Sequence, residues 1–137
     1  MGIAALITWL LTAAGGFVLL GMWVAKGGAR EGGSTRLPAP VVFGHFLLAA
    51  AGLVIWIIYL VVDSTALAWI AFALLVPVAL LGFAMLIRWI PVYRERAALG
   101  AEQPVEKNFP IAIVGGHGVF AVATVVLVFL TALGVGD

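Results

Sequence analysis

The two histidines are the residues best suited to chemistry in this chain of 137 residues, which contains no cysteine. His45 and His117 each follow a glycine, and each lies seven residues after a proline, Pro38 or Pro110. Proline is common at the start of a helix, because its missing N–H would have no partner there. Seven helical residues rise about 10 Å. The spacing therefore places both imidazoles at the same height above two equivalent helix starts.

The elements that position these histidines are long uncharged stretches. Asp, Glu, Lys and Arg are absent from residues 1–25, 37–62, 64–87 and 108–136. Each stretch exceeds the roughly 20 apolar residues that a helix needs to cross a bilayer. The chain is 65% hydrophobic and 9% charged, whereas soluble domains carry about 25% charge. We predict an all-α membrane protein, a four-transmembrane-helix bundle of up-down-up-down topology forming a single transmembrane domain over residues 1–137.

The same composition excludes several classes of protein. The polar connections are too short to hold a soluble catalytic domain, and we expect no catalytic residues in them. Without cysteine there are no disulfides and no thiolate-bound zinc or iron–sulfur clusters. The net charge of +1 gives no basic surface for nucleic acid.

The few charges predict an orientation in the membrane. With four helices drawn, every basic residue falls on one side: Lys26, Arg30, Arg36, Arg88, Arg94, Arg96 and Lys107. The other side holds only Asp63, Asp137 and the N-terminal amine. Short loops rich in Lys and Arg stay in the cytoplasm. We expect a multi-pass protein of a prokaryotic cell membrane, with both termini outside and Trp23 and Trp89 as anchors at the inner interface.

Two sequence segments recur along the chain. Residues 16–23 resemble residues 82–89 at an offset of 66, and residues 38–51 resemble residues 110–123 at an offset of 72. Apolar segments of biased composition can match by coincidence, but here the only two histidines pair with each other. We therefore predict a tandem duplication of a helical hairpin. The first hairpin repeat covers residues 1–62 and the second covers residues 66–137.

The paired histidines predict a metal cofactor. In such a bundle the second and fourth helices are diagonal neighbours, and both imidazoles can face the centre. An ionisable side chain inside a membrane is costly without a partner and indicates a functional site. A bare zinc ion would need two further protein ligands, and no carboxylate or thiol lies at that depth. A haem supplies four equatorial nitrogens, so we expect one haem b, with His45 and His117 as its metal ligands. Hydrogen bonding of each imidazole to backbone or neighbouring side chains is the alternative.

Small residues flank both histidines and favour a flat macrocycle. Gly44 and Gly116 precede the histidines, and Ala49 and Ala121 lie one turn beyond them on the same face. Arg88 directly follows the third uncharged stretch and lies in the last turn of the helix predicted there. We expect Arg88 either to pair with a haem propionate or to extend to the lipid headgroups.

Two parallel helices that offer one histidine each resemble the haem arrangement of transmembrane b-type cytochromes. The ascorbate-dependent cytochromes b and the membrane anchors of quinone-linked dehydrogenases are the nearest comparisons. The resemblance covers the four-helix core and the two histidine positions, and it implies a bis-histidine haem that transfers electrons. The first of these families has two histidine pairs, whereas this chain has one pair near the inner face, which leaves electron exchange at the cytoplasmic side.

The expected function is therefore a membrane-embedded b-type haem protein that transfers electrons near the cytoplasmic face. Its partners would be the lipid bilayer and either a quinone or the other subunits of an oxidoreductase complex. The sequence leaves open whether the chain is an enzyme by itself. The alternative is a cofactor-free accessory or assembly subunit that packs against other membrane subunits or a second copy. A small transporter is less favoured, because no Asp or Glu lies inside any span.

Overall fold

The computed structural model describes residues 1–95 and 100–136 and is helical throughout its long elements. The elements in chain order are α1 (Gly2–Ala25), α2 (Ala39–Val62), α3 (Thr65–Arg94), the short 3₁₀ helix η1 (Val105–Asn108) and α4 (Ile111–Ala132). The four α-helices are long and apolar enough to cross a membrane. The all-helical class is confirmed, and the four apolar helices fit a multi-pass membrane protein.

The prolines begin the helices that carry the histidines. Pro38 caps α2 and Pro110 caps α4, with nearly identical backbone angles. Asp63 ends α2 in the left-handed conformation, at φ 55° and ψ 45°, and Thr65 begins α3 two residues later. α3 continues through Pro77 and Pro91 to Arg94.

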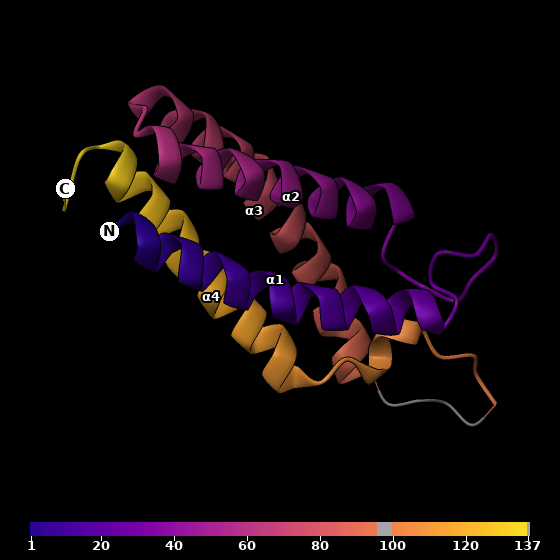
Figure 1. The fold of residues 1–137 in the computed structure, drawn as a ribbon. Coiled ribbons are helices and arrows are strands. Elements are labelled where there is room, and N and C mark those ends of the chain that lie inside the picture. The colour runs from indigo at the N-terminus through magenta and orange to yellow at the C-terminus, as the bar shows by residue number, and fades with distance from the viewer. Residues whose placement is uncertain (96–99, 137) are drawn as a thin grey trace.

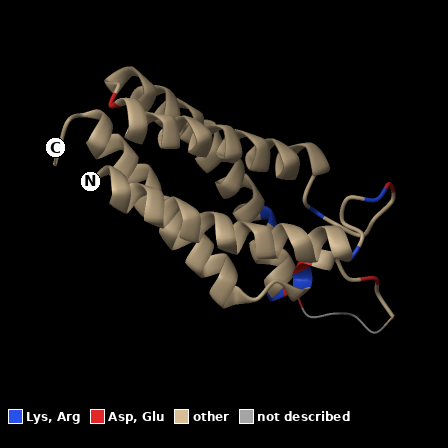
Figure 2. Ribbon diagram, in the orientation of Figure 1, with Lys and Arg blue, Asp and Glu red and all other residues tan. Residues whose placement is uncertain are grey.

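The two ends of the molecule differ in charge. The start of α1, the end of α4 and the α2–α3 turn lie at one end, and the two longer connections lie at the other (Figure 1). The described Lys and Arg residues gather at this second end, which we call the basic end (Figure 2). Two charges that the sequence assigned to opposite sides, Arg96 and Asp137, lie outside the described residues.

Each hairpin packs mainly on the other hairpin. The closest helix pairs are α2 with α3 and α1 with α4, whereas α1 and α2 of the first hairpin pack least among the helices that touch each other. α1 and α3 are diagonal to each other, as are α2 and α4, since neither pair brings its described backbones into contact. The histidine helices are therefore diagonal neighbours.

Buried positions recur at the two offsets seen in the sequence. Ala5 and Ala71 are both 0% exposed, and Trp56 is replaced at the equivalent position by Val128, which is also 0% exposed. Leu37 and Phe109 form a similar pair at the basic end, in one core cluster with Trp23 and Trp89. Positions related by the two offsets are thus buried in the core in both hairpins, even where their residue types differ. The origin of the hairpins by duplication stays a prediction.

The expected role of Trp23 and Trp89 as anchors facing the lipid is not what the structure shows. Their side chains are only 1% and 6% exposed and pack inside the bundle at the basic end. Buried indole N–H groups need acceptors, and the connections provide them. Trp23 donates to the Thr35 hydroxyl at 2.9 Å, and Trp89 donates to the Glu106 carbonyl oxygen at 3.0 Å.

A buried carboxylate joins the two long connections at this end. Glu106 is 0% exposed. Its carboxylate accepts hydrogen bonds from the Thr35 hydroxyl at 2.9 Å and from the Arg36 backbone N–H at 2.6 Å. The connection before α2 is thereby fixed to the connection before α4, which holds the starts of the two histidine helices at matching heights.

Candidate functional site

The two histidines converge at the centre of the bundle. The centroids of their imidazole rings are 6.1 Å apart, and the ring planes are inclined by 60°. The rings come from α2 and α4, whose backbones are too far apart to touch. His45 and His117 therefore bridge the bundle along its diagonal.

Each imidazole is fixed at one nitrogen by a backbone carbonyl. His45 Nδ1 lies 2.9 Å from the Val78 oxygen, and His117 Nδ1 lies 2.8 Å from the Thr12 oxygen. A carbonyl oxygen can only accept, so Nδ1 is the protonated, donating nitrogen in both rings. In the neutral ring Nε2 then keeps its lone pair. Histidines that bind metals usually hold the other nitrogen in this way.

These contacts follow the sequence offsets. The acceptors Thr12 and Val78 are 66 residues apart, and the two histidines are 72 apart. Each histidine donates to a carbonyl of the other hairpin, since His45 reaches α3 and His117 reaches α1. The site therefore needs both hairpins.

Two glycines make room for the rings. A Cβ atom on Gly16 would lie 3.0 Å from His117 Cε1, and one on Gly82 would lie 3.2 Å from His45 Cε1. Both distances are shorter than ordinary van der Waals contact, so a larger residue would push the ring. Gly16 and Gly82 are also 66 residues apart.

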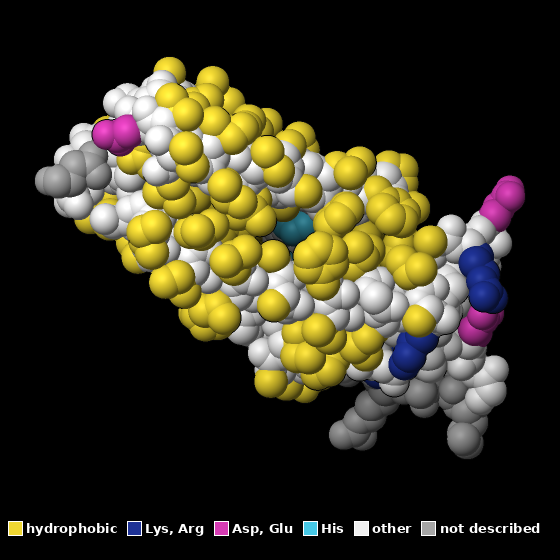
Figure 3. All heavy atoms as spheres, in the orientation of Figure 1, with side chains coloured by type: hydrophobic (Ala, Val, Ile, Leu, Met, Phe, Trp, Pro, Cys, Tyr) yellow, Lys and Arg dark blue, Asp and Glu magenta, His cyan; other side chains and the backbone are white. Residues whose placement is uncertain are grey.

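The small residues predicted beside the histidines leave space. A Cβ atom on Gly116 would meet nothing within 4 Å, and one on Gly44 would meet only Leu81 Cδ1 at 3.9 Å. Ala49 and Ala121 are partly buried on the same helices. Figure 3 shows a histidine side chain at the bottom of a hollow between α1 and α2, surrounded by hydrophobic side chains. These two helices, α1 and α2, pack least among the helices that touch each other.

Arg88 lies at the basic end and is exposed. Its Nη1 donates to the Arg36 carbonyl oxygen at 3.3 Å. Among the described residues, Arg88 makes no hydrogen bond to either histidine, so the structure does not bring it into the histidine pair.

The donor set can be tested against the expected cofactor. Within the described residues, no group of three or more His, Cys, Asp and Glu side chains could hold a metal ion. A bare ion would therefore have only two protein ligands. Two imidazoles that bind one ion from opposite sides at about 2.0–2.1 Å have ring centroids about 6.3–6.5 Å apart, and the observed separation is 6.1 Å. The separation is thus close to what two imidazoles on one metal need, and His45 and His117 are the residues that would hold a haem.

Several residues of the site were not expected from the sequence. The sequence could not predict that the Thr12 and Val78 carbonyls accept from the histidines, because every residue has the same backbone oxygen. Gly16 and Gly82 begin the two segments that recur at an offset of 66, and this recurrence is the only sequence signal for their equivalent roles. The hydrogen bond from the Thr124 hydroxyl to the Thr8 hydroxyl, 3.0 Å long and between α4 and α1, was also not predicted.

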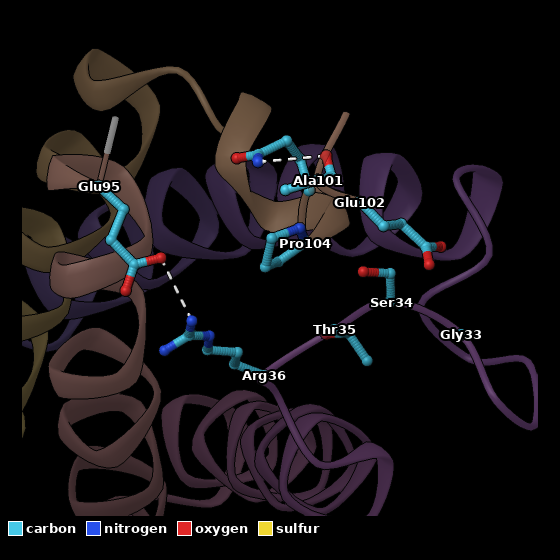
Figure 4. A pocket seen from close by; sticks show the side chains of 9 residues that line it. Gly33, Ser34, Thr35, Arg36, Glu95, Ala101, Glu102 and Pro104 are labelled. Atoms are coloured by element: carbon cyan, nitrogen blue, oxygen red, sulfur yellow. Dashed lines mark hydrogen bonds and ion pairs between the residues drawn. The ribbon is translucent and has the colours of Figure 1, made fainter. Parts of the chain in front are cut away.

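The basic end contains a cavity of about 510 Å³ between the two connections. Figure 4 shows the side chains that line it, with Arg36 turned toward Glu95 across the cavity. Arg36 Nη2 and Glu95 Oε2 are 3.2 Å apart. Glu102 adds a further negative charge to the lining. The lining thus holds one ion pair, Arg36 with Glu95, and one further carboxylate, that of Glu102.

Comparisons with models of protein families, with characterised proteins and with solved structures found no match to this chain.

Proposed function

We propose that this chain is a membrane-embedded b-type haem protein in which His45 and His117 would hold one haem. The observation that carries the proposal is the convergence of the two imidazoles at 6.1 Å, each with Nδ1 bound to a carbonyl. A haem would supply one-electron redox chemistry at this place. Its electrons would be exchanged near the cytoplasmic face, with a quinone or within an oxidoreductase complex.

The chain's own groups would hold and insulate such a cofactor. The Nδ1–H bonds to Thr12 and Val78 fix the ring orientations and make Nε2 a stronger donor to a metal. Gly16 and Gly82 let both rings lie close to the neighbouring helices. The hydrophobic side chains around the hollow keep water away (Figure 3). Arg88, at the basic end, is the cation available to a propionate group.

The proposal includes an orientation of four helices that alternate in direction across the bilayer. The described basic residues gather at one end of the molecule (Figure 2). By the excess of Lys and Arg in cytoplasmic loops, this end faces the cytoplasm and both termini lie outside. The histidine pair then lies about two helical turns below the inner surface.

The test is the absorbance spectrum of the protein purified from haem-sufficient cells. The reduced-minus-oxidised spectrum is expected to show a sharp Soret band and resolved α and β bands. The bands should disappear in His45→Ala and in His117→Ala. They should persist in Gly21→Ala, because a Cβ atom at Gly21 meets nothing within 4 Å. A colourless, folded wild-type protein that cannot be reconstituted with haem would overturn the proposal.

A second candidate is a cofactor-free accessory subunit. It is favoured by the fact that the described residues contain no buried side-chain polar atom without a hydrogen-bond partner. The bundle can therefore be stable without a ligand between the imidazoles. In that case the protein would be colourless, and His45→Ala would lose only the bond to Val78.

A further inference from the structure

A second cavity at the basic end combines cations with the start of an apolar helix. It measures about 600 Å³ and lies between the connection after α1, the start of α2 and the side chain of Arg88 on α3. Three arginines, Arg30, Arg36 and Arg88, and one acidic residue, Glu31, are among the residues that line it. The remaining walls include Leu37, Pro38 and Ala39, which lead into α2.

The three guanidinium groups are not equally available. Arg36 also lines the first cavity, where its side chain turns toward Glu95 (Figure 4). Arg88 uses Nη1 to donate to the Arg36 carbonyl oxygen and keeps its other N–H groups. The Arg30 side chain donates no hydrogen bond within the described part of the chain. Arg30 and Arg88 are therefore the two cations with donors to spare, against the single carboxylate of Glu31.

The position of the cavity selects an amphiphilic ligand. Arg88 follows Ile87, which is 68% exposed and belongs to the apolar surface of α3. The cavity thus lies where the apolar helices end and the charged connections begin. In a bilayer this boundary is the level of the lipid headgroups. A phosphate at Arg30 and Arg88 would leave the acyl chains of the same molecule beside the apolar helices.

We infer that this cavity binds the phosphate of an anionic phospholipid from the cytoplasmic leaflet, held by Arg30 and Arg88. Guanidinium groups bind phosphate oxygens in pairs of charge-assisted hydrogen bonds. A zwitterionic lipid would bring a quaternary ammonium group toward the same cations, so the site favours headgroups with net negative charge. The inference rests on the proposed orientation but not on the histidine pair, because the cavity lining does not include His45 or His117 and shares only Arg88 with the proposed haem site.

The test is native mass spectrometry of the detergent-solubilised full chain titrated with phosphatidylglycerol or phosphatidylcholine. Wild type is expected to retain one phosphatidylglycerol in preference to phosphatidylcholine. Loss of one charged hydrogen-bonding partner should weaken this binding about tenfold. Arg30→Ala and Arg88→Ala should both show this loss. Arg88→Lys should fall between wild type and Arg88→Ala, because lysine keeps the charge without the paired donors.

Arg94→Ala is the matched control, since Arg94 is an exposed arginine of α3 outside the lining. Its lipid binding should equal that of wild type. Equal loss in Arg94→Ala, or equal retention of both lipids by wild type, would overturn the inference. Competition by inorganic phosphate at the concentration of the lipid would show a site for free phosphate and would also overturn it.

A titration of the His45→Ala, His117→Ala double variant separates this inference from the proposed function. The lipid preference is expected to persist without any haem. Arg88→Ala that changes the haem spectrum while leaving the lipid preference intact would assign Arg88 to the cofactor and contradict the lipid site.

Discussion

His45 and His117 are held by backbone atoms, which makes the site tolerant of substitution at its acceptors. The Thr12 and Val78 oxygens belong to the main chain, so side-chain changes at these positions leave the acceptors in place. The positions that must stay small are Gly16 and Gly82, because each lies against an imidazole. Among side-chain positions on the helices that carry no histidine, Gly16 and Gly82 are therefore the ones where a substitution would press on Cε1 of an imidazole.

Gly16→Ala and Gly82→Ala should each turn one imidazole away from its present orientation. The added Cβ atoms would lie 3.0 Å and 3.2 Å from Cε1 of His117 and His45, so the rings must shift by a few tenths of an ångström. We expect weaker haem retention and altered g-values in the electron paramagnetic resonance spectrum of the oxidised protein. Gly21→Ala is the control in α1. Wild-type spectra in both variants would contradict the positioning role of these glycines.

Glu106→Gln should destabilise the basic end. The Glu106 carboxylate accepts from Thr35 and from the Arg36 N–H, whereas an amide turns a donor toward one of them. A buried donor left without a partner costs about 1–3 kcal/mol. We expect a lower midpoint of thermal unfolding in detergent. Glu102→Gln is the control, because Glu102 is exposed, and it should leave the unfolding midpoint unchanged. An unchanged midpoint in Glu106→Gln would contradict the role of the buried carboxylate.

The sequence predicted some features of these residues and missed others for clear reasons. The matching heights of His45 and His117 follow from their equal distances to Pro38 and Pro110, and the structure brings the rings together. The burial of Trp23 and Trp89 was not predicted, because a tryptophan at a helix end can face lipid or the core equally well. Only the placement of Thr35 and Glu106 decides between these orientations.

At the scale of the helices, the two main interfaces are built from different side chains. Between α1 and α4, the hydroxyl of Thr124 lies 3.0 Å from that of Thr8. The equivalent of Thr124 in α2 is Gly52, which packs against the Trp9 ring. The α1–α4 interface therefore uses a hydrogen bond between hydroxyl groups, whereas at the equivalent place between α2 and α3 Leu74 packs on Gly52, which also receives the Trp9 ring from α1.

Gly52→Val should loosen this second contact. A Cβ atom at Gly52 would already lie 3.1 Å from the Trp9 ring, and valine adds two methyl groups. Overpacking of this kind costs about 1–3 kcal/mol. We expect a lower unfolding midpoint in detergent and a change in tryptophan fluorescence. Ala51→Val, at the exposed neighbouring position of α2, should change neither, and equal effects of both substitutions would contradict the packing argument.

The helices themselves were largely predictable, but their pairing was not. Uncharged stretches and Pro38 and Pro110 mark the helices and two of their starts. α3 runs on to Arg94 at the basic end, past the charge at Arg88 that closes its uncharged stretch. Nothing in the hydrophobic pattern says that α1 prefers α4 to α2, because all four helices are apolar on every face.

At the scale of the whole molecule, the charge distribution makes a prediction about topology. A reporter enzyme that works only outside the cytoplasm should be active when fused after residue 136. It should be inactive when inserted near Gly32 in the connection between α1 and α2. The reverse pattern would place the histidine pair near the outer surface and contradict the proposed orientation.

Because the two hairpins pack closely on each other, we predict that the chain can be expressed as two separate fragments that assemble. Fragments 1–63 and 64–137 should assemble when they are expressed together, because α1 packs best on α4 and α2 packs best on α3. We expect a haem spectrum from the coexpressed pair and none from either fragment alone. Copurification of the fragments without the spectrum would show that assembly does not need the cofactor. A spectrum from one fragment alone would contradict the requirement for both hairpins.

The bond between His117 and Thr12 also sets an order on biosynthesis. It joins α1 to α4, so it cannot form until α4 has been synthesised. The segment from α1 to α4 must therefore leave the ribosome before the centre of the bundle can close. Until then only His45 of the pair has been made, and a product truncated before α4 offers half of the proposed ligand pair. If the pair holds a haem as proposed, the cofactor can be held by both imidazoles only after α4 has been made.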